Sequence, residues 1–274
     1  MAARPPSLRR ARTKQAAPRN SSSSRPPSQD FESLHFPNGQ YAQRFHNNFM
    51  GKPVTPSFYI DIDEFSDITI CGNTIVQLLR QWDKTLSIEE RVYENLIRVF
   101  YSNMDLSSTR KIKIITFVGG VHIEFYEVDL CSILGIQYGG LDIYTTRKEL
   151  DFNDFCHVDG VRNICRRRDL FDDLCSLSFR CQLLPFQVHI LHSILQHMVT
   201  PRQGHSDEVT KLDVSLLDSL IRRWHVSLSY TILRHVLSTP TVTNQSLPYN
   251  SIITRILRHF NVPLTEPVMS RPES

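Results

Sequence analysis

Apolar positions spaced as on one face of a helix recur through most of the chain. The first such face comprises Ile75, Leu78, Leu79 and Trp82, which follow the i, i+3, i+4, i+7 spacing of an amphipathic helix. A second helix is predicted to begin after Ser87, because Ser87 and Glu90 match the capping-box pattern. Its apolar face would comprise Ile88, Val92, Leu96, Val99 and Phe100.

The period of the pattern changes between residues 111 and 125. Apolar and polar residues alternate there as on a half-buried strand, and Gly119-Gly120 stands in the middle. Two glycines tolerate the positive φ angles of a tight turn, so this segment is predicted to be a β-hairpin. A short helix is expected next over Glu127–Leu134, ending at Gly135.

Every element predicted after residue 183 is a helix. The polar, Pro-containing connections 201–210 and 238–250 are predicted to be loops. The apolar stripes are Phe186, Ile190, Ile194 and Met198; Val214, Leu217, Leu220, Ile221 and Trp224; Tyr230, Leu233, Val236 and Leu237; and Ile252, Ile253, Ile256, Leu257 and Phe260. The predicted fold class is therefore α+β and predominantly helical, with a hairpin-containing first half and an all-helical second half.

Composition separates the first 29 residues from the rest. The chain carries 31 basic and 28 acidic side chains; seven of the basic and none of the acidic ones lie in residues 1–29, which leaves 24 basic against 28 acidic. With five prolines and six serines, this segment has too little apolar surface to offset its chain entropy. A disordered basic tail over residues 1–30 is predicted, followed by a domain over residues 35–265. A subdivision of that domain into an α+β part (35–182) and a helical part (183–265) is compatible with the pattern.

The tail contains a cluster of cations formed by Arg9, Arg10, Arg12 and Lys14. Such a cluster is typical of a nuclear import signal or of an arm that binds nucleic-acid phosphates. A solubilising tail and an organelle transit peptide are alternatives, since the segment is rich in Arg and Ser and lacks acid. The expected location is the nucleus or cytoplasm, with the plastid as the alternative.

Neither a membrane nor an oxidising compartment is indicated. No apolar run approaches the roughly 20 residues of a membrane-spanning helix, and no apolar stretch of a secretory signal follows Met1. Six cysteines are too few for a disulfide scaffold in a chain of 274 residues, and are expected to be reduced thiols inside the cell.

Motifs of mobile-element enzymes are missing from the sequence. There is no Tyr-x-Asp-Asp turn, no Asp-Thr/Ser-Gly, no Gly-x-Ser-x-Gly and no phosphate-binding Gly-rich loop with Lys-Ser/Thr. The nearest acidic pairs, Asp61 with Asp63 and Asp172 with Asp173, are more typical of solvated faces. They are also the carboxylates on which a degenerate nuclease-like or integrase-like metal site would depend. No catalytic residue, metal ligand or cofactor is assigned.

Cysteine and histidine side chains form two further groups. Cys156-His157, Cys165, Cys175 and Cys181 fall within 26 residues, but without the paired spacing of a structural zinc site. Buried thiols are the preferred interpretation. His189 and His192 are placed on the polar face of the helix that begins at Phe186, with His197 at its margin.

Five ordered blocks resemble the plant transposon protein domain family, whose members are plant proteins associated with retroelement-like sequences. The blocks span residues 90–104, 118–140, 201–223, 230–240 and 247–264. The chain departs from the family at Asn250, where Leu-Pro-Tyr-Gly is expected; Asn also tolerates left-handed backbone, so the turn is expected to survive. The family's biochemical role is undefined, so the resemblance transfers no site residues.

Together these patterns predict a transposon-derived, non-enzymatic interaction module. Its helical half would bind a protein or self-associate, and its basic tail would contact nucleic acid.

Overall fold

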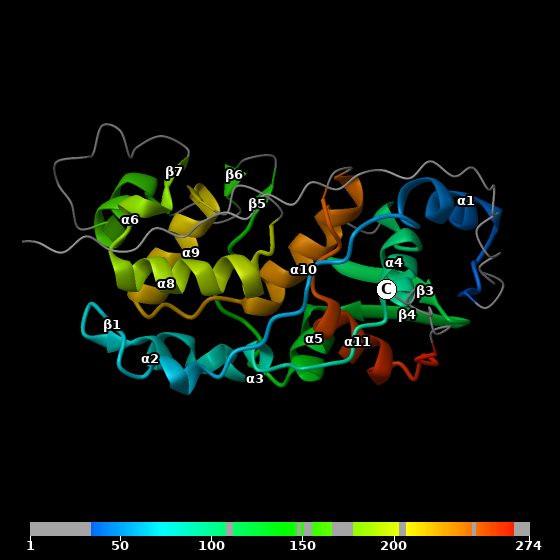
Figure 1. Cartoon of the computed structure of the whole chain (residues 1–274), viewed down its shortest axis with the longest axis horizontal. Helices are drawn as coiled ribbons and strands as arrows, with labels where there is room; N and C mark the ends of the chain where they lie inside the picture. The colour runs from blue at the N-terminus through cyan, green and yellow to red at the C-terminus, as the bar shows by residue number, and fades with distance from the viewer. Residues whose placement is uncertain are drawn as a thin grey trace, which may run out of the picture. The chain divides into compact units, whose positions relative to one another are not determined.

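The computed structural model describes residues 34–107, 112–146, 149–150, 155–165, 178–202, 207–242 and 245–265 (Figure 1). These residues belong to one compact unit that begins at Glu32. Helices predominate over short strands among them, which confirms the α+β, predominantly helical class. The tail cations Arg9, Arg10, Arg12 and Lys14 lie outside the described residues.

The first half combines short helices with small antiparallel strand pairs. Its helices are α1 (Gly39–Asn48), α2 (Ile75–Leu79), α3 (Asp83–Leu86), α4 (Glu94–Ser102), α5 (Glu127–Leu134) and α6 (His157–Cys165), with 3₁₀ turns η2 (Ile62–Phe65) and η3 (Arg80–Trp82). Its strands are β1 (Thr69–Ile70), β2 (Asn73–Thr74), β3 (Lys113–Val118), β4 (Val121–Tyr126), β5 (Thr145–Thr146), β6 (Glu149–Leu150) and β7 (Ser178–Arg180).

In the described part of the second half, the elements are helices and helical turns apart from one strand, β8 (Glu208–Thr210), which pairs antiparallel with β7. Part of the predicted loop 201–210 is therefore a strand, because residues 178–180 supply its partner. The helices are α8 (Phe186–Ile194), its π-helical continuation η6 (Leu195–Val199), α9 (Lys211–Ile221), α10 (Leu228–Ser238) and α11 (Asn250–His259), with 3₁₀ turns η5 (Cys181–Leu183) and η7 (Thr239–Thr241).

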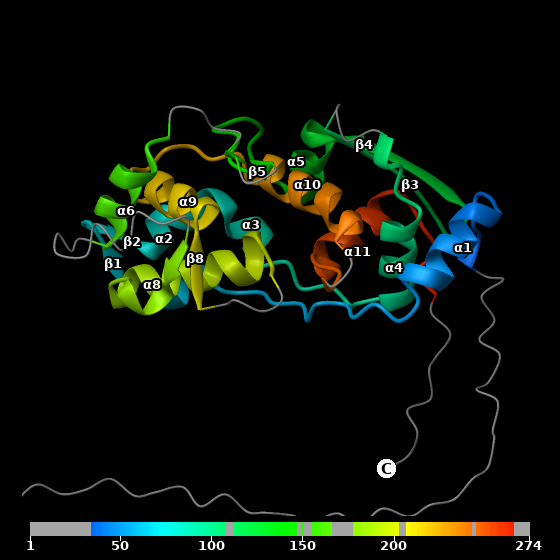
Figure 2. The same ribbon diagram turned by 90° about the horizontal axis from the view of Figure 1, so that it is seen from above.

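The hairpin and the helix after it lie where the pattern predicts them. Val118 pairs with Val121 across a two-residue turn, and Gly119 and Gly120 both have positive φ (56° and 81°), as a type I′ turn requires. Alternate residues of β3 and β4 are buried, and α5 ends at Gly135 in the left-handed conformation. Helix α10 lies beside the hairpin and contacts β3 and α5 (Figure 2).

The helix predicted to begin after Ser87 begins instead at Glu94. Ser87 ends α3, and its N–H donates to the Asp83 carbonyl at 2.9 Å. The Glu90 carboxylate accepts a hydrogen bond from Arg258 Nη2 at 2.7 Å rather than from a capped backbone. The capping-box prediction is wrong because a cation 168 residues away in sequence binds the acid.

The face of α8 that packs inward is rotated from the predicted one. Phe186 is 72% exposed and Ile190 only partly buried, whereas Val188, Leu191, Leu195 and Val199 are buried. The buried face includes His192, so its predicted place on the polar face is wrong. This face packs against polar groups of α9 and β8. Asp213 Oδ2 lies 3.6 Å from His192 Nε2, and Gln196 Nε2 donates to the Glu208 carbonyl at 3.2 Å.

Helix α9 lies inside the fold rather than on its surface. It contacts α2, α6, α8 and β8, with α6 and α8 on either side of it in Figure 1. Nine consecutive residues, from Asp213 to Ile221, are buried. The apolar stripe predicted for this helix is buried except for Trp224, which lies beyond its end and is 40% exposed.

The start of α11 differs in one detail from the expected turn. The left-handed residue is Tyr249 (φ 60°), while Asn250 is the first residue of the helix. The expected turn is present, and its left-handed residue is the one before Asn250.

Gly140 lies where two segments distant in sequence come into backbone contact. Leu141 forms a parallel bridge with Val226, and a Cβ at residue 140 would lie 2.7 Å from the His225 carbonyl oxygen and 2.8 Å from the Ser227 nitrogen. Its φ of 115° is also one that side-chain-bearing residues rarely adopt. Both the conformation and the space therefore require glycine.

We expect Gly140→Ala to lower the free energy of unfolding by about 3 kcal/mol or more, because backbone strain and a backbone clash add. Gly139→Ala is the matched control: its φ of 97° is strained as well, but nothing lies within 4 Å of the added Cβ. Urea unfolding should show the smaller loss, about 1–2 kcal/mol, for the control. Equal losses would contradict the steric role of Gly140.

Candidate functional site

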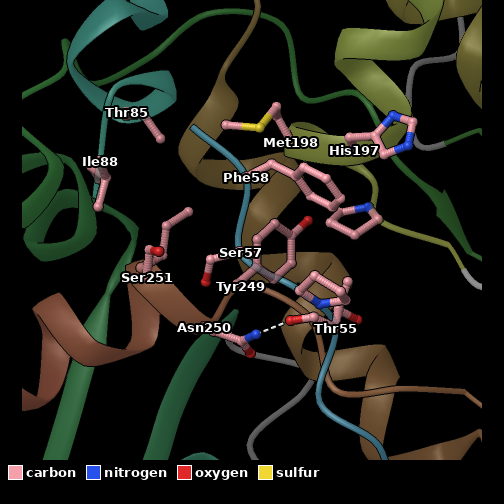
Figure 3. A pocket seen from close by; sticks show the side chains of 13 residues that line it. Thr55, Ser57, Phe58, Thr85, Ile88, His197, Met198, Tyr249, Asn250 and Ser251 are labelled. Atoms are coloured by element: carbon pink, nitrogen blue, oxygen red, sulfur yellow. Dashed lines mark hydrogen bonds between the residues drawn. The ribbon is translucent and has the colours of Figure 1, made fainter. Parts of the chain in front are cut away.

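A small pocket forms where segments from both ends of the described chain meet (Figure 3). An extended segment, residues 55–58, makes one wall; α3, the end of η6 and the first turn of α11 make the others. The wall is fixed at both ends by backbone hydrogen bonds, from Thr55 N to the Leu247 carbonyl (2.9 Å) and from Ile60 N to the Leu86 carbonyl (3.0 Å). The lining residues are Thr55, Pro56, Ser57, Phe58, Thr85, Ile88, His197, Met198, Pro201, Tyr249, Asn250, Ser251 and Ile252.

The pocket is narrow. It offers about 40 Å³ to the centres of water-sized groups. Since one water needs about 10–15 Å³ by this measure, roughly three non-hydrogen atoms fit. Its enclosed part therefore suits one small polar group.

Tyr249 forms one wall of the pocket and is held by a buried hydrogen-bond chain. Its hydroxyl donates to the Val199 carbonyl at 2.5 Å and lies 2.9 Å from Nδ1 of His235. Because the hydroxyl proton goes to Val199, Nδ1–H of His235 donates to the hydroxyl oxygen, and Nε2 accepts from Gln245 Nε2 at 3.3 Å.

This chain of hydrogen bonds is uncharged at neutral pH. Burial, with a smaller effect from the Arg202 charge, lowers the pKa of His235 to about 4. Burial likewise raises the pKa of Tyr249 well above its ordinary value. The pair therefore positions the pocket wall and does not exchange protons near pH 7.

A second buried network surrounds Asp213 at the start of α9. Its Oδ2 accepts from Arg202 Nη2 at 2.6 Å and from the N–H and hydroxyl of Thr210, each at 2.7 Å. His192 Nε2 lies 3.6 Å from the same oxygen. Burial by itself raises the pKa of Asp213, but His192, Arg202 and the Thr210 N–H outweigh it and hold the pKa below the ordinary value.

This His–Asp–Thr arrangement resembles a nucleophilic triad only in composition. The Thr210 hydroxyl donates to the carboxylate and caps α9 by accepting from the Asp213 N–H at 3.4 Å, rather than pointing at the histidine. His192 is 1% exposed. The arrangement therefore stabilises the first turn of a buried helix and presents no nucleophile to a substrate.

The acidic residues singled out from the sequence have local roles where the structure describes them. Asp61 and Asp63 are exposed on either side of the buried Ile62. Asp61 Oδ1 accepts from the Asp63 N–H at 3.0 Å, and Asp63 lies 3.7 Å from Arg80 Nη2. Asp172 and Asp173 lie outside the described residues, so the carboxylate metal site stays a prediction.

The cysteines of the predicted group differ in burial. Cys165 and Cys181 are buried, as the thiol interpretation predicts, and burial raises the pKa of Cys165 to about 11. Cys156 is exposed, and Cys175 lies outside the described residues. Among the described residues, no three His, Cys, Asp or Glu side chains come together in a way that would hold a metal ion.

The pocket itself was not predicted from the sequence. Two of its polar residues, Thr85 and Ser251, lie in segments more than 160 residues apart, and contacts between such distant segments leave no local pattern. The one local feature is that Leu-Pro-Tyr-Asn leads into α11 without a Ser, Thr or Asp at the N-cap position.

Similarity to known sequences identifies the class of protein. A family model described as "Putative plant retrotransposon-related domain" matches residues 78–263, which is most of the chain. The protein is thus related to plant transposons, as the sequence blocks predict. The chain belongs to this plant retrotransposon-related domain family. No curated protein and no solved structure matches it.

The helices that the structure describes are all too short or too polar to cross a lipid bilayer.

Replacing Asp213 tests the role of the second network. We expect Asp213→Asn to lower the free energy of unfolding by about 3 kcal/mol at pH 7, because it leaves Arg202 and the Thr210 hydroxyl without an anionic acceptor. Asp159→Asn, which breaks an exposed pair with Arg162, should cost less than about 0.5 kcal/mol.

The same pair of variants gives a pH dependence. A carboxyl with a lowered folded-state pKa contributes stability above its unfolded pKa, and that contribution is lost as pH falls through the folded pKa. The difference in the free energy of unfolding between wild type and Asp213→Asn should be constant from about pH 5 to 8 and shrink below about pH 4. A difference that grows on acidification would contradict the ion pair.

Proposed function

We propose that this plant retrotransposon-related protein is a non-enzymatic interaction module that binds nucleic acid through residues 1–29, here called the basic arm. The carrying observation is the separation of charge: seven cations and no acid in the basic arm, against 24 basic and 28 acidic side chains in the rest. Polyanions are attracted to concentrated positive charge, and the displaced counterions add to the affinity.

Ion pairs in the folded part support this division. Arg98 binds Glu94 at 2.7 Å, Lys113 binds Glu124 at 2.6 Å, Arg222 binds Asp218 at 2.9 Å and Arg258 binds Glu90 at 2.7 Å. A cation that already has a carboxylate partner gains less from a phosphate. These four cations are therefore less available to phosphates.

The folded part would bind a protein partner or a second copy of the chain. Phe58 lines the pocket and Tyr59 follows it in the chain; the two side chains are 45% and 56% exposed. Exposed aromatic side chains are enriched at protein interfaces, where they supply contact area at low entropic cost. The buried, structurally engaged His192–Asp213 pair and the uncharged His235–Tyr249 pair support a role without catalysis.

A salt series on the full chain tests the basic arm. Nucleic-acid affinity should fall by about 0.7–0.9 in log units per phosphate contact for each tenfold rise in salt. We expect the triple variant Arg9→Gln, Arg10→Gln and Arg12→Gln to reduce the slope of log affinity against log salt concentration by about 2–3. A matched variant that replaces Arg4, Arg19 and Arg25 should reduce it less, because those charges are dispersed. Unchanged slopes in both variants would remove the basic arm from binding.

The cluster Arg9, Arg10, Arg12 and Lys14 would also direct nuclear import. A fluorescent reporter fused to residues 1–30 should accumulate in the nucleus of plant cells, and the variant with the four cations replaced by Gln should not. Reporter in plastids or mitochondria would show instead that the segment is a transit peptide.

A further inference from the structure

The first turn of α11 opens into the pocket with its backbone donors free. Tyr249 occupies the N-cap position but supplies no side-chain hydrogen bond. The first N–H bonded in this turn is that of Ile253, to the Tyr249 carbonyl at 2.8 Å. The N–H groups of Asn250, Ser251 and Ile252 have no acceptor among the described residues, and all three residues line the pocket.

Two hydroxyl groups face the same space and are also without a partner. Thr85 Oγ1, from α3, and Ser251 Oγ, from α11, are buried and make no hydrogen bond within the described part of the chain. Thr85 is 5% exposed and Ser251 is 7% exposed, so surrounding solvent does not readily satisfy them. A buried hydroxyl without a partner costs free energy, and in a native protein it calls for an explanation.

The first turn of α11 is held in place by a hydrogen bond to the opposite wall of the pocket. Asn250 Nδ2 donates a hydrogen bond to the Thr55 carbonyl, which joins the start of α11 to the extended segment (Figure 3). The donors are thus presented by two fixed elements, α3 and α11, and need not rearrange to receive an acceptor.

Charge and size select the kind of acceptor. The N-terminus of a helix carries roughly half a positive charge, and the lining residues that the structure describes include His197 but no Lys, Arg, Asp or Glu. A single negative charge suits this field, whereas a doubly charged phosphate would lack a compensating cation. The room for roughly three non-hydrogen atoms equals one carboxylate group, and Phe58, Ile88 and Met198 offer apolar contact to the carbon chain that bears it.

We propose that this pocket binds a carboxylate, with the N–H groups of the first turn of α11 and the hydroxyls of Thr85 and Ser251 as donors. The site goes beyond the nucleic-acid function, since it uses no residue of the basic arm. A carboxylate reaches it either as a free small acid or as part of a peptide, and these two sources share the chemistry described.

The test is an NMR titration of the full, ¹⁵N-labelled chain with sodium acetate, against sodium chloride at equal ionic strength. Acetate should cause saturable shifts of the amides of Ser251, Ile252 and Thr85, while acetamide, its neutral isostere, should not. Tighter binding of inorganic phosphate than of acetate, or shifts absent from α11, would overturn the proposal.

A double variant separates binding from folding. Thr85→Val with Ser251→Ala removes two hydroxyls that lack protein partners, so the melting temperature should stay the same or rise, while the affinity for acetate falls at least about tenfold. Thr254→Val is the matched control, because the Thr254 hydroxyl is also buried and without a partner, one turn along α11 and outside the pocket. It should leave acetate binding unchanged. Retained binding in the double variant, or equal loss in the control, would refute the site.

Two blocked amino acids then identify the source. N-acetylalanine presents the carboxylate of a peptide C-terminus, and N-acetylglutamate α-amide presents that of an acidic side chain. Tighter binding of either one than of acetate assigns the pocket to that form of peptide; binding of acetate alone assigns it to a free small acid.

Discussion

The buried charges of α9 are the constraint on which the surrounding structure depends. Asp213 and Asp218 lie in a run of nine buried residues, and a charge removed from water is tolerated only when partners surround it. Arg202 and Thr210 satisfy Asp213; Arg222 and Asn163, whose Nδ2 lies 2.6 Å from Oδ1, satisfy Asp218. The strand that precedes α9 and the helix α6 that lies against it are therefore fixed in position by electrostatics as well as by apolar packing.

This network and the pocket share one short segment of chain. Val199 accepts the Tyr249 hydroxyl, Pro201 lines the pocket, and Arg202 binds Asp213. The Arg202 charge also contributes to the lowered pKa of His235. Residues 199–202 thus connect the Asp213 network to the wall of the pocket. A shift of this segment would change the contacts of Asp213 and of Tyr249 together.

Local patterns in the sequence predict the elements whose causes are local. The Gly119-Gly120 turn, the end of α5 at Gly135 and the apolar positions of α9 follow from backbone conformation and periodicity within a few residues. The wrong predictions concern residues that contact distant parts of the chain. Glu90 binds Arg258 instead of capping a helix, and His192 lies on the buried face of α8, next to Asp213. The pocket belongs to the second kind, because its donors come from α3 and α11.

The extended segment at residues 55–58 contacts a part of the chain that is synthesised much later. Thr55 and Ser246, whose hydroxyl oxygens lie 2.7 Å apart, are separated by 191 residues, and the segment lies outside the span shared with the family. Contacts of such high sequence separation carry the largest loop-closure entropy, and they form after more local structure. During synthesis the pocket has no second wall until the start of α11 has left the ribosome. A chain that is truncated before α11 therefore lacks one wall of the pocket.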